Sequence, residues 1–195
     1  MQFEEFHDRL WKILDPVDEN AFEPICAEPA SDEAVQAVAG LVGAQLPEWL
    51  VRFCQRTNGL FIEAREEVWP YSKEFDIAPA WTFWRGLVLL GIEHETLPDW
   101  ATISRAWEWL LDWGVTDVLP LLKVDGDADR LWGLRIRAGE VLDEVVEVID
   151  GQVRVLEGTF LDLYETQIAE LMTRQKDMVK LLPKERARRA RRRGA

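Results

Sequence analysis

The sequence is poor in the residue types on which most metal sites and disulfide-stabilised folds depend. Its 195 residues include only two cysteines and two histidines. Cys26 and Cys54 form no Cys-x-x-Cys pair, and two thiols are too few for a disulfide framework. No cysteine or second histidine is spaced to complete a zinc site around His94. We therefore expect no structural metal and no disulfide-stabilised core.

Motifs for phosphate binding and nucleophilic catalysis are absent as well. The sequence contains neither a Walker loop nor Gly-x-Gly-x-x-Gly, and no serine lies in a Gly-x-Ser-x-Gly setting. The uncharged apolar stretch from Gly86 to Ile92 is too short to cross a bilayer. The residues after Met1 do not resemble a signal peptide. These absences predict a cytoplasmic protein that has no catalytic residues and no cofactor and does not enter membranes.

Two local patterns resemble sites, and each has a simpler explanation. His94 has a glutamate on either side, but sequence neighbours on a strand point to opposite faces and build no shared site. The acids of residues 125–129 alternate as in a calcium loop. However, Arg130 stands where that loop needs glycine and Ile136 where it needs a bidentate glutamate. We predict a polar turn between two strands at residues 125–129.

The charge is unevenly distributed along the chain. Acids number 36 against 23 lysines and arginines, which gives a formal net charge of −13. The segment from Lys184 to Ala195 holds seven bases and one acid, a charge of +6, which leaves −19 on residues 1–183. Such a body repels nucleic acid and attracts basic partners. The tail has no aromatic side chain to stack on a base, so we expect a disordered tail, or one folded back on the acidic body, rather than a nucleic-acid arm.

Hydrophobic spacing predicts one α+β domain over residues 1–183. Apolar residues at helical spacing predict helices over 3–14, from Ser31 to Val42, from Pro47 to Thr57, over 98–113 and from Thr159 to Pro183. Short apolar runs predict strands over 60–62, 75–77, 87–92, 118–124, 131–136, 144–149 and 152–156, whereas 19–30 is expected to be a loop. Because helices come first and strands later, we expect a mostly antiparallel sheet closed by a long C-terminal helix.

Tryptophan is unusually frequent, and seven of the ten fall in a single stretch. Trp100, Trp107 and Leu111 share one predicted helical face, which favours burial in the core. Trp109 and Trp113 form a second stripe, which either packs under a neighbouring loop or stays exposed as a docking surface. We favour burial for this stripe too.

Several short motifs occur in the order typical of one superfamily. The motifs are Ala30-Ser31-Asp32-Glu33, Leu46-Pro47-Glu48-Trp49-Leu50-Val51-Arg52-Phe53, Asn58-Gly59, Val118-Leu119-Pro120-Leu121-Leu122, Asp125-Gly126-Asp127, Gly139-Glu140-Val141 and Phe160 with the last helix. The first three describe a capped helix, a Leu-Pro that enters the next helix, and an Asn-Gly that ends it. Over residues 24–172 the chain thus resembles the SUKH superfamily, which unites a fungal cell-wall-assembly regulator with many bacterial immunity proteins.

The resemblance implies an α+β fold around a twisted antiparallel sheet, with no catalytic residues to transfer. Bacterial members bind and neutralise toxin domains, many of them nucleases. A body with a charge of −19 complements the basic cleft of a nuclease and speeds association. We therefore expect a non-catalytic protein-binding module, an immunity protein that covers a basic toxin domain. A housekeeping regulatory scaffold of the same fold is the alternative.

The predicted contact surface combines acids, which steer a basic partner, with aromatic anchors, which prolong its binding. Its residues are Glu63, Glu66, Glu67, Asp125, Asp127 and Asp129, with Trp69 and Tyr71 as the anchors. A third alternative, an enzyme, would require His94 to lie beside a carboxylate in a pocket. The sequence does not determine the oligomeric state.

Overall fold

The computed structural model describes residues 2–71, 83–127 and 129–193. Within them, seven strands form one antiparallel sheet in which sequence order is also spatial order. The strands are β1 (Phe22–Ile25), β2 (Leu60–Ala64), β3 (Gly86–Leu89), β4 (Val118–Val124), β5 (Arg130–Arg137), β6 (Glu140–Ile149) and β7 (Gln152–Val155). The α+β class and the antiparallel sheet predicted from the sequence are confirmed.

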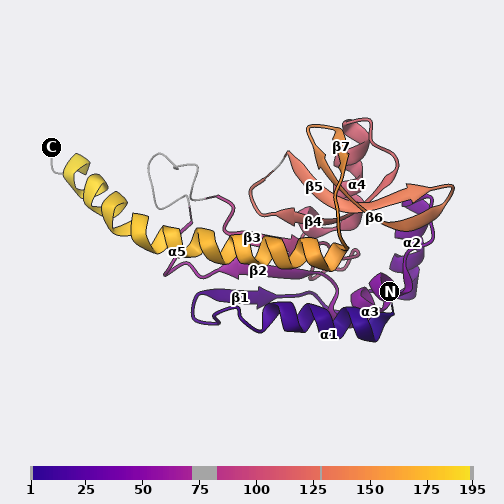
Figure 1. The fold of residues 1–195 in the computed structure, drawn as a ribbon, viewed down its shortest axis with the longest axis horizontal. Coiled ribbons are helices and arrows are strands. Elements are labelled where there is room, and N and C mark those ends of the chain that lie inside the picture. The colour runs from indigo at the N-terminus through magenta and orange to yellow at the C-terminus, as the bar shows by residue number, and fades with distance from the viewer. Residues whose placement is uncertain (1, 72–82, 128, 194–195) are drawn as a thin grey trace.

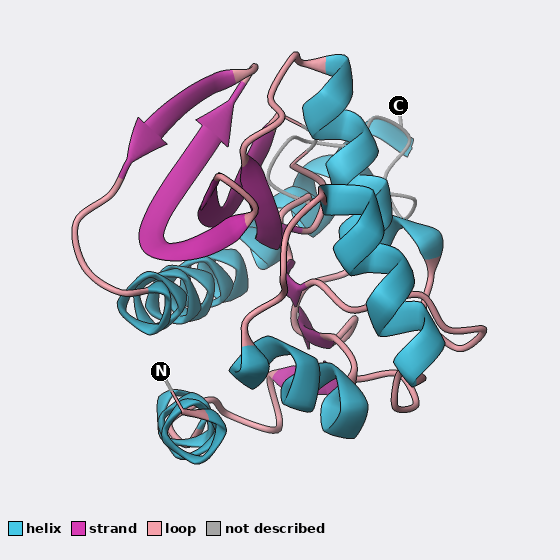
Figure 2. Cartoon of the chain, turned by 90° about the vertical axis from the view of Figure 1, so that its right-hand side faces the viewer, coloured by secondary structure: helices cyan, strands magenta, loops and turns pink. Residues whose placement is uncertain are grey.

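The helices lie on both sides of this sheet. They are α1 (Phe3–Leu14), α2 (Asp32–Val42), α3 (Glu48–Thr57), the short 3-10 helix η3 (Asp99–Ala101), α4 (Ile103–Asp112) and α5 (Phe160–Arg193). Figure 1 shows α5 running along the sheet, and Figure 2 shows α1 and α5 end-on at one side of the molecule with other helices opposite. None of the helices in the described ranges has the length and apolarity that a membrane span requires.

An aromatic stack joins three of the helices. The ring of Phe6 in α1 lies 4.3 Å from that of Trp49 in α3, and Trp49 lies 5.9 Å from Phe160 at the start of α5. Cys54 is completely buried nearby in the same core, and burial raises the pKa of its thiol to about 12. The thiol is therefore protonated at neutral pH, as predicted for an inert core cysteine.

Asn58 ends α3 and ties three separate segments together. Its buried side chain donates to the carbonyl oxygens of Glu28 and Ile92, at 3.0 and 2.9 Å, and accepts from the Ile92 N–H at 2.8 Å. Gly59 follows with a φ of 75°, a left-handed conformation in which a side chain would be strained. The Asn-Gly pair predicted to end this helix therefore also positions the loops around it.

The predicted buried face of residues 98–113 is wrong in part. Trp107 is buried, but Trp100 is 38% and Leu111 44% exposed. The reason lies at Thr102, whose hydroxyl caps α4 by accepting from the Arg105 N–H. Trp100 consequently belongs to η3, and its direction does not follow the periodicity of the helix. The predicted strand at residues 75–77 lies outside the described residues.

The C-terminal segment also departs from the sequence prediction. Pro183 lies inside α5 instead of ending it, and the helix continues to Arg193 through most of the segment for which a disordered or folded-back tail was expected. A proline removes one backbone hydrogen bond and crowds the preceding turn. Met178 and Leu182 are nevertheless buried on the turns just before it, at 2% and 6% exposure. Tertiary packing thus holds the helix at the point where local propensity would break it.

Candidate functional site

Four of the predicted contact residues line one pocket at the edge of the sheet. Glu63 comes from β2, and Glu66, Glu67 and Tyr71 come from the turn that follows. Pairing of β1 with β2 adds Glu23, which lies directly opposite Glu63. The cavity has a volume of about 220 Å³ and is lined by Glu23, Glu63, Ala64, Arg65, Glu66, Glu67, Tyr71 and Arg85. We refer to Glu23, Glu63, Glu66 and Glu67 as the acidic patch.

A buried cation fixes the base of this pocket. Arg85 is only 3% exposed, and its guanidinium donates to the Glu63 carboxylate and to the carbonyl oxygen of Ala64. Its Cζ lies 3.8 Å from the centre of the Tyr71 ring, while the Tyr71 hydroxyl donates to Glu63 at 2.6 Å. The hydrogen bond to Glu63 raises the pKa of Tyr71. Glu63 is thus held by two partners and forms a rigid base.

The outer acids of the patch are less constrained. Glu23 lies 3.4 Å from Arg65, whose Nε also donates to the carbonyl oxygen of Glu19. Glu66 and Glu67 are exposed, and neither forms an ion pair with any residue that the structure describes. Four carboxylates face two guanidinium groups around the cavity. The pocket therefore carries a net negative charge, and two of its acids are available to an outside group.

The acids of the β4–β5 turn are divided between two environments. Asp125 is half-buried, and burial raises its pKa, although the charges of Lys123 and Arg85 act in the opposite direction. Its interaction with Arg85 places it near the base of the acidic patch. Asp127 instead lies 3.7 Å from Arg130 and accepts from the Asp129 N–H at 3.2 Å. Asp127 and Asp129 form the predicted polar turn, and neither is among the described residues that line the acidic pocket.

Trp69 does not serve as an exposed anchor, so this part of the prediction is wrong. It is 2% exposed and belongs to the hydrophobic core, and its backbone N–H donates to the carbonyl oxygen of Arg65 at 2.9 Å. The turn that exposes Glu66 and Glu67 therefore directs the indole inward. Tyr71, by contrast, is 37% exposed beside the patch.

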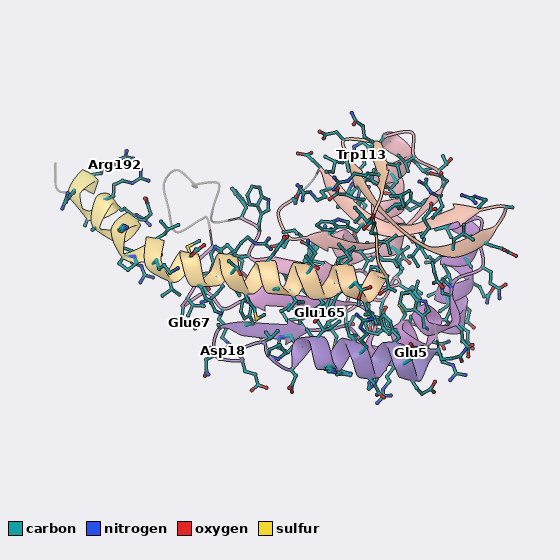
Figure 3. All side chains as sticks on the ribbon, viewed as in Figure 1. Glu5, Asp18, Glu67, Trp113, Glu165 and Arg192 are labelled. Atoms are coloured by element: carbon teal, nitrogen blue, oxygen red, sulfur yellow. The ribbon has the colours of Figure 1, made fainter. Side chains whose placement is uncertain are left out.

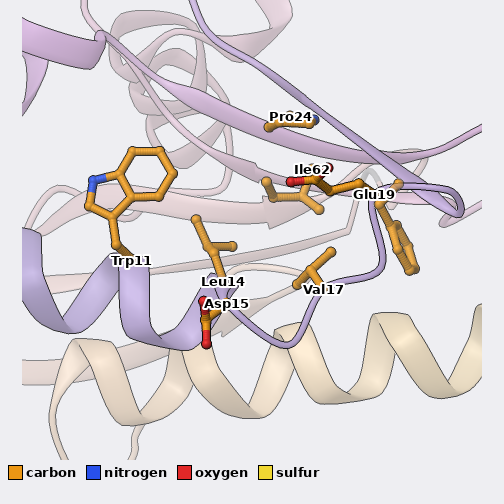
Figure 4. Close-up of a pocket in the computed structure, with 8 residues that line it drawn as sticks. Trp11, Leu14, Asp15, Val17, Glu19, Pro24 and Ile62 are labelled. Atoms are coloured by element: carbon orange, nitrogen blue, oxygen red, sulfur yellow. The ribbon is translucent and has the colours of Figure 1, made fainter.

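A second pocket lies on the opposite face of the first two strands, because Pro24 and Ile62 alternate with Glu23 and Glu63 along the paired strands. Figure 4 shows this apolar pocket, of about 300 Å³, between the end of α1 and the first two strands. It is lined by Trp11, Leu14, Asp15, Val17, Glu19, Phe22, Pro24 and Ile62. Trp11 is 44% exposed, and its indole N–H donates to His7 at 2.8 Å. Trp11 was not among the predicted contact residues. Its position on the polar side of an amphipathic helix nevertheless indicates that its side chain is exposed.

A third feature, also missed in the sequence, is a lysine enclosed by indole rings. Lys123 in β4 is 6% exposed, and its Nζ lies 4.6 Å from the centre of the Trp109 ring and 5.1 Å from that of Trp100. It forms no hydrogen bond or ion pair with a described side chain. Burial lowers its pKa to about 8. The sequence feature that could have identified Lys123 is its position as the single charged residue within the apolar run of residues 118–124.

The histidine considered for catalysis lies in an open environment. His94 Nδ1 is 2.9 Å from the Thr96 hydroxyl, and Nε2 is 4.0 Å from the exposed carboxylate of Glu28. Within the ranges that the structure covers, no three His, Cys, Asp or Glu side chains are grouped so as to hold a metal ion. His94 thus has a carboxylate beside it, but neither His94 nor Glu28 lines the acidic or the apolar pocket.

Sequence comparison adds no family assignment to this geometry. No protein-family model matches the chain, and no curated protein matches it. The resemblance to the SUKH superfamily remains a prediction.

Proposed function

We propose that the protein is a non-catalytic binding module that holds a basic protein partner against the acidic patch. The observation that carries the proposal is the pair of exposed acids, Glu66 and Glu67, which have no ion-pair partner among the described residues. They stand over Glu63, which Arg85 and Tyr71 hold in place. Glu63 is therefore preorganised, whereas Glu66 and Glu67 are exposed and available to pair with a basic group.

Charge and apolar contact have separate roles in this proposal. The charge of −19 on residues 1–183 attracts a basic surface over a distance and raises its rate of association. A partner that reaches around the edge strand β1 meets the apolar pocket of the opposite face, and contact with the exposed indole of Trp11 there slows its dissociation. Trp11 therefore takes the anchoring role that the sequence analysis gave to Trp69.

A toxin domain is the specific partner that we propose, and it is supported by the SUKH resemblance together with the charge. A nuclease presents a basic cleft to its substrate, and an acidic surface that covers this cleft blocks substrate entry. Inhibition would then require occlusion and no chemical step.

The proposal is tested by capturing partners with tagged protein from the native organism's lysate and from effectors of neighbouring cells. Wild-type protein is compared with Glu66→Lys/Glu67→Lys and with a control of equal charge change, Glu140→Lys/Asp143→Lys. The control acids are exposed on β6, which lies away from β1 and β2 in Figure 1. We expect the wild type and the control to retain a basic partner that elutes at high salt, and the patch variant to lose it by about tenfold or more.

The identity of the captured protein decides between the specific alternatives. A basic nuclease-like domain whose activity is blocked supports an immunity protein. An endogenous, non-toxic protein held through the same acids would instead assign a regulatory scaffold. Equal capture by the wild type and the patch variant would contradict the acidic patch as the binding surface.

A further inference from the structure

The last three turns of α5 form a basic arm, which we define as residues 184–193. Six bases of the arm with described side chains are Lys184, Arg186, Arg188, Arg189, Arg191 and Arg192. The one acid, Glu185, pairs with Arg188 at 2.6 Å. Figure 1 shows that α5 extends past the sheet at this end.

One face of the arm concentrates the positive charge. Lys184, Arg188, Arg191 and Arg192 are separated by three or four residues, so they share a face of the helix, and all four are exposed. Together with Ala187 they line a shallow groove. Like charges at this spacing destabilise a helix, and Pro183 removes a backbone hydrogen bond at the start of the arm. An anionic partner would relieve this repulsion and stabilise the arm as a helix.

We propose that the basic arm of one copy of the chain docks on the acidic patch of a second copy. The two surfaces have opposite charge, and each has charged groups without intramolecular ion pairs in the described structure. Figure 3 places Arg192 and Glu67 toward the same end of the long axis, whereas Trp113 and Glu5 lie toward the other end. A two-fold axis at the shared end brings each arm onto the other copy's patch. The result is a closed dimer with two equal contacts.

The acidic pocket contains a further group that an arm would satisfy. Nε of Arg85 is buried and has no hydrogen-bond partner among the described residues, although the side chain lines the pocket. It is a donor and requires an acceptor, because leaving a buried donor unpaired is costly. A backbone carbonyl oxygen has two lone pairs, so one that is already bonded within a helix can still accept from a second donor. A docked arm therefore offers cations to the patch acids and carbonyl oxygens to Arg85.

The same features favour a second copy over a nucleic acid. A nucleic acid drawn to the arm would also meet the charge of −19 on residues 1–183, which repels it. The arm also lacks an aromatic side chain on which a base could stack. A copy of this chain, in contrast, presents the arm with carboxylates.

The dimer does not depend on the proposed function, but it uses the same patch. The arm of a second copy would occupy the place of a basic partner and compete with it. The following test measures self-association of the purified chain alone, so its outcome is independent of whether such a partner exists.

The experiment is sedimentation velocity on the full-length chain over a concentration series, at about 50 mM and about 500 mM NaCl. We expect a dimer at low salt whose association constant falls about tenfold or more at high salt, because its contacts are exposed ion pairs. Arg188→Gln/Arg191→Gln/Arg192→Gln, the arm variant, is expected to weaken the low-salt dimer by about tenfold. Lys12→Gln/Arg56→Gln/Arg137→Gln removes three exposed bases elsewhere and should leave the dimer unchanged.

A mixing experiment identifies the two surfaces. Glu66→Lys/Glu67→Lys is expected to dimerise as weakly as the arm variant, because each loses both contacts of the homodimer. An equimolar mixture of the two retains one native arm–patch contact, so we expect it to associate more strongly than either variant alone. Circular dichroism checks that every variant is folded.

Three results would overturn the proposal. The first is a wild-type chain that remains monomeric at low salt throughout the series. The second is a dimer that the arm variant forms as well as the wild type. The third is arm-dependent binding of a labelled duplex of about 20 base pairs that is tighter than self-association at the same salt, which would assign the arm to nucleic acid.

Discussion

Two buried cations lie close together in the sheet, and the protein accommodates them in opposite ways. Arg85 and Lys123 are 3% and 6% exposed, and the charges of both act on Asp125. Arg85 donates to a carboxylate and to a backbone carbonyl, whereas Lys123 lies against two indole rings. The planar guanidinium binds several acceptors at once and stays charged, while a buried ammonium loses its proton more readily. The comparison indicates that Arg85 holds neighbouring groups in place. Burial of Lys123 instead destabilises the fold, and contact with the two indole rings offsets part of that loss.

Replacing Arg85 is expected to give the largest effect. Arg85→Met removes the cation from a buried ion pair and leaves Glu63 half-buried, with the Tyr71 hydroxyl as its one remaining side-chain partner among the described residues. We expect the free energy of unfolding to fall by about 3 kcal/mol, measured by urea denaturation. Glu63→Gln/Arg85→Met should lose less than the sum of the two single losses, because no unpaired charge remains. A loss below about 1 kcal/mol for Arg85→Met would show that this pair does not organise the pocket.

Replacing Lys123 is expected to raise the free energy of unfolding, whereas replacing Arg85 lowers it. Lys123→Met fills the same space with an apolar chain, and we expect it to stabilise the fold by about 1 kcal/mol, since the loss of the indole contacts offsets part of the desolvation that it avoids. Because the pKa is lowered from 10.5 to about 8 on folding, the unfolded wild type binds more protons between these values. Wild-type stability should therefore rise with pH across this interval.

The control for this prediction is Lys12→Met, which changes an exposed lysine in α1. Denaturation at several pH values between about 7 and about 10 should show a steeper rise for the wild type and the Lys12 variant than for Lys123→Met. Equal slopes in all three proteins would refute the assignment of a lowered pKa to Lys123.

The smallest effect is expected at Tyr71. Tyr71→Phe keeps the ring against Arg85 and removes only the hydroxyl that donates to Glu63. Because this residue is partly exposed, we expect a loss of about 0.5–1 kcal/mol in the free energy of unfolding. A loss as large as that of Arg85→Met would mean that the hydroxyl, and not the guanidinium, holds Glu63 in place.

Local sequence patterns were sufficient for the elements that are stabilised locally. The Ser31 cap was predicted from a residue type whose hydrogen bond reaches only to Ala34, and the end of α3 from the left-handed backbone that Gly59 adopts without strain. β1 was missed because its alternation is weak and it contains Pro24. Pairing with β2 stabilises this strand. Because β1 is an edge strand, its outer side requires no backbone donor, so Pro24 is tolerated.

The candidate site could likewise be predicted only where its residues are close in sequence. Glu63, Glu66 and Glu67 are close in sequence, so their clustering could be predicted. Glu23 and Arg85 reach the pocket only through pairing across the sheet, and no local pattern indicates it. The helical arm was missed because the proline rule describes local strain and does not include the packing around Leu182.

The three hydrogen bonds of the Asn58 side chain, which we call the clamp, also affect how fast this residue deamidates. An asparagine followed by glycine is the sequence most prone to deamidation, since the glycine nitrogen easily attacks the side-chain amide. Here that amide is buried and held by backbone groups of Glu28 and Ile92, so the attack requires the clamp to open. A folded molecule is consequently protected at this position, and an unfolded one is not. Accumulated aspartate or isoaspartate at residue 58 would therefore record how long a population of these molecules has spent unfolded.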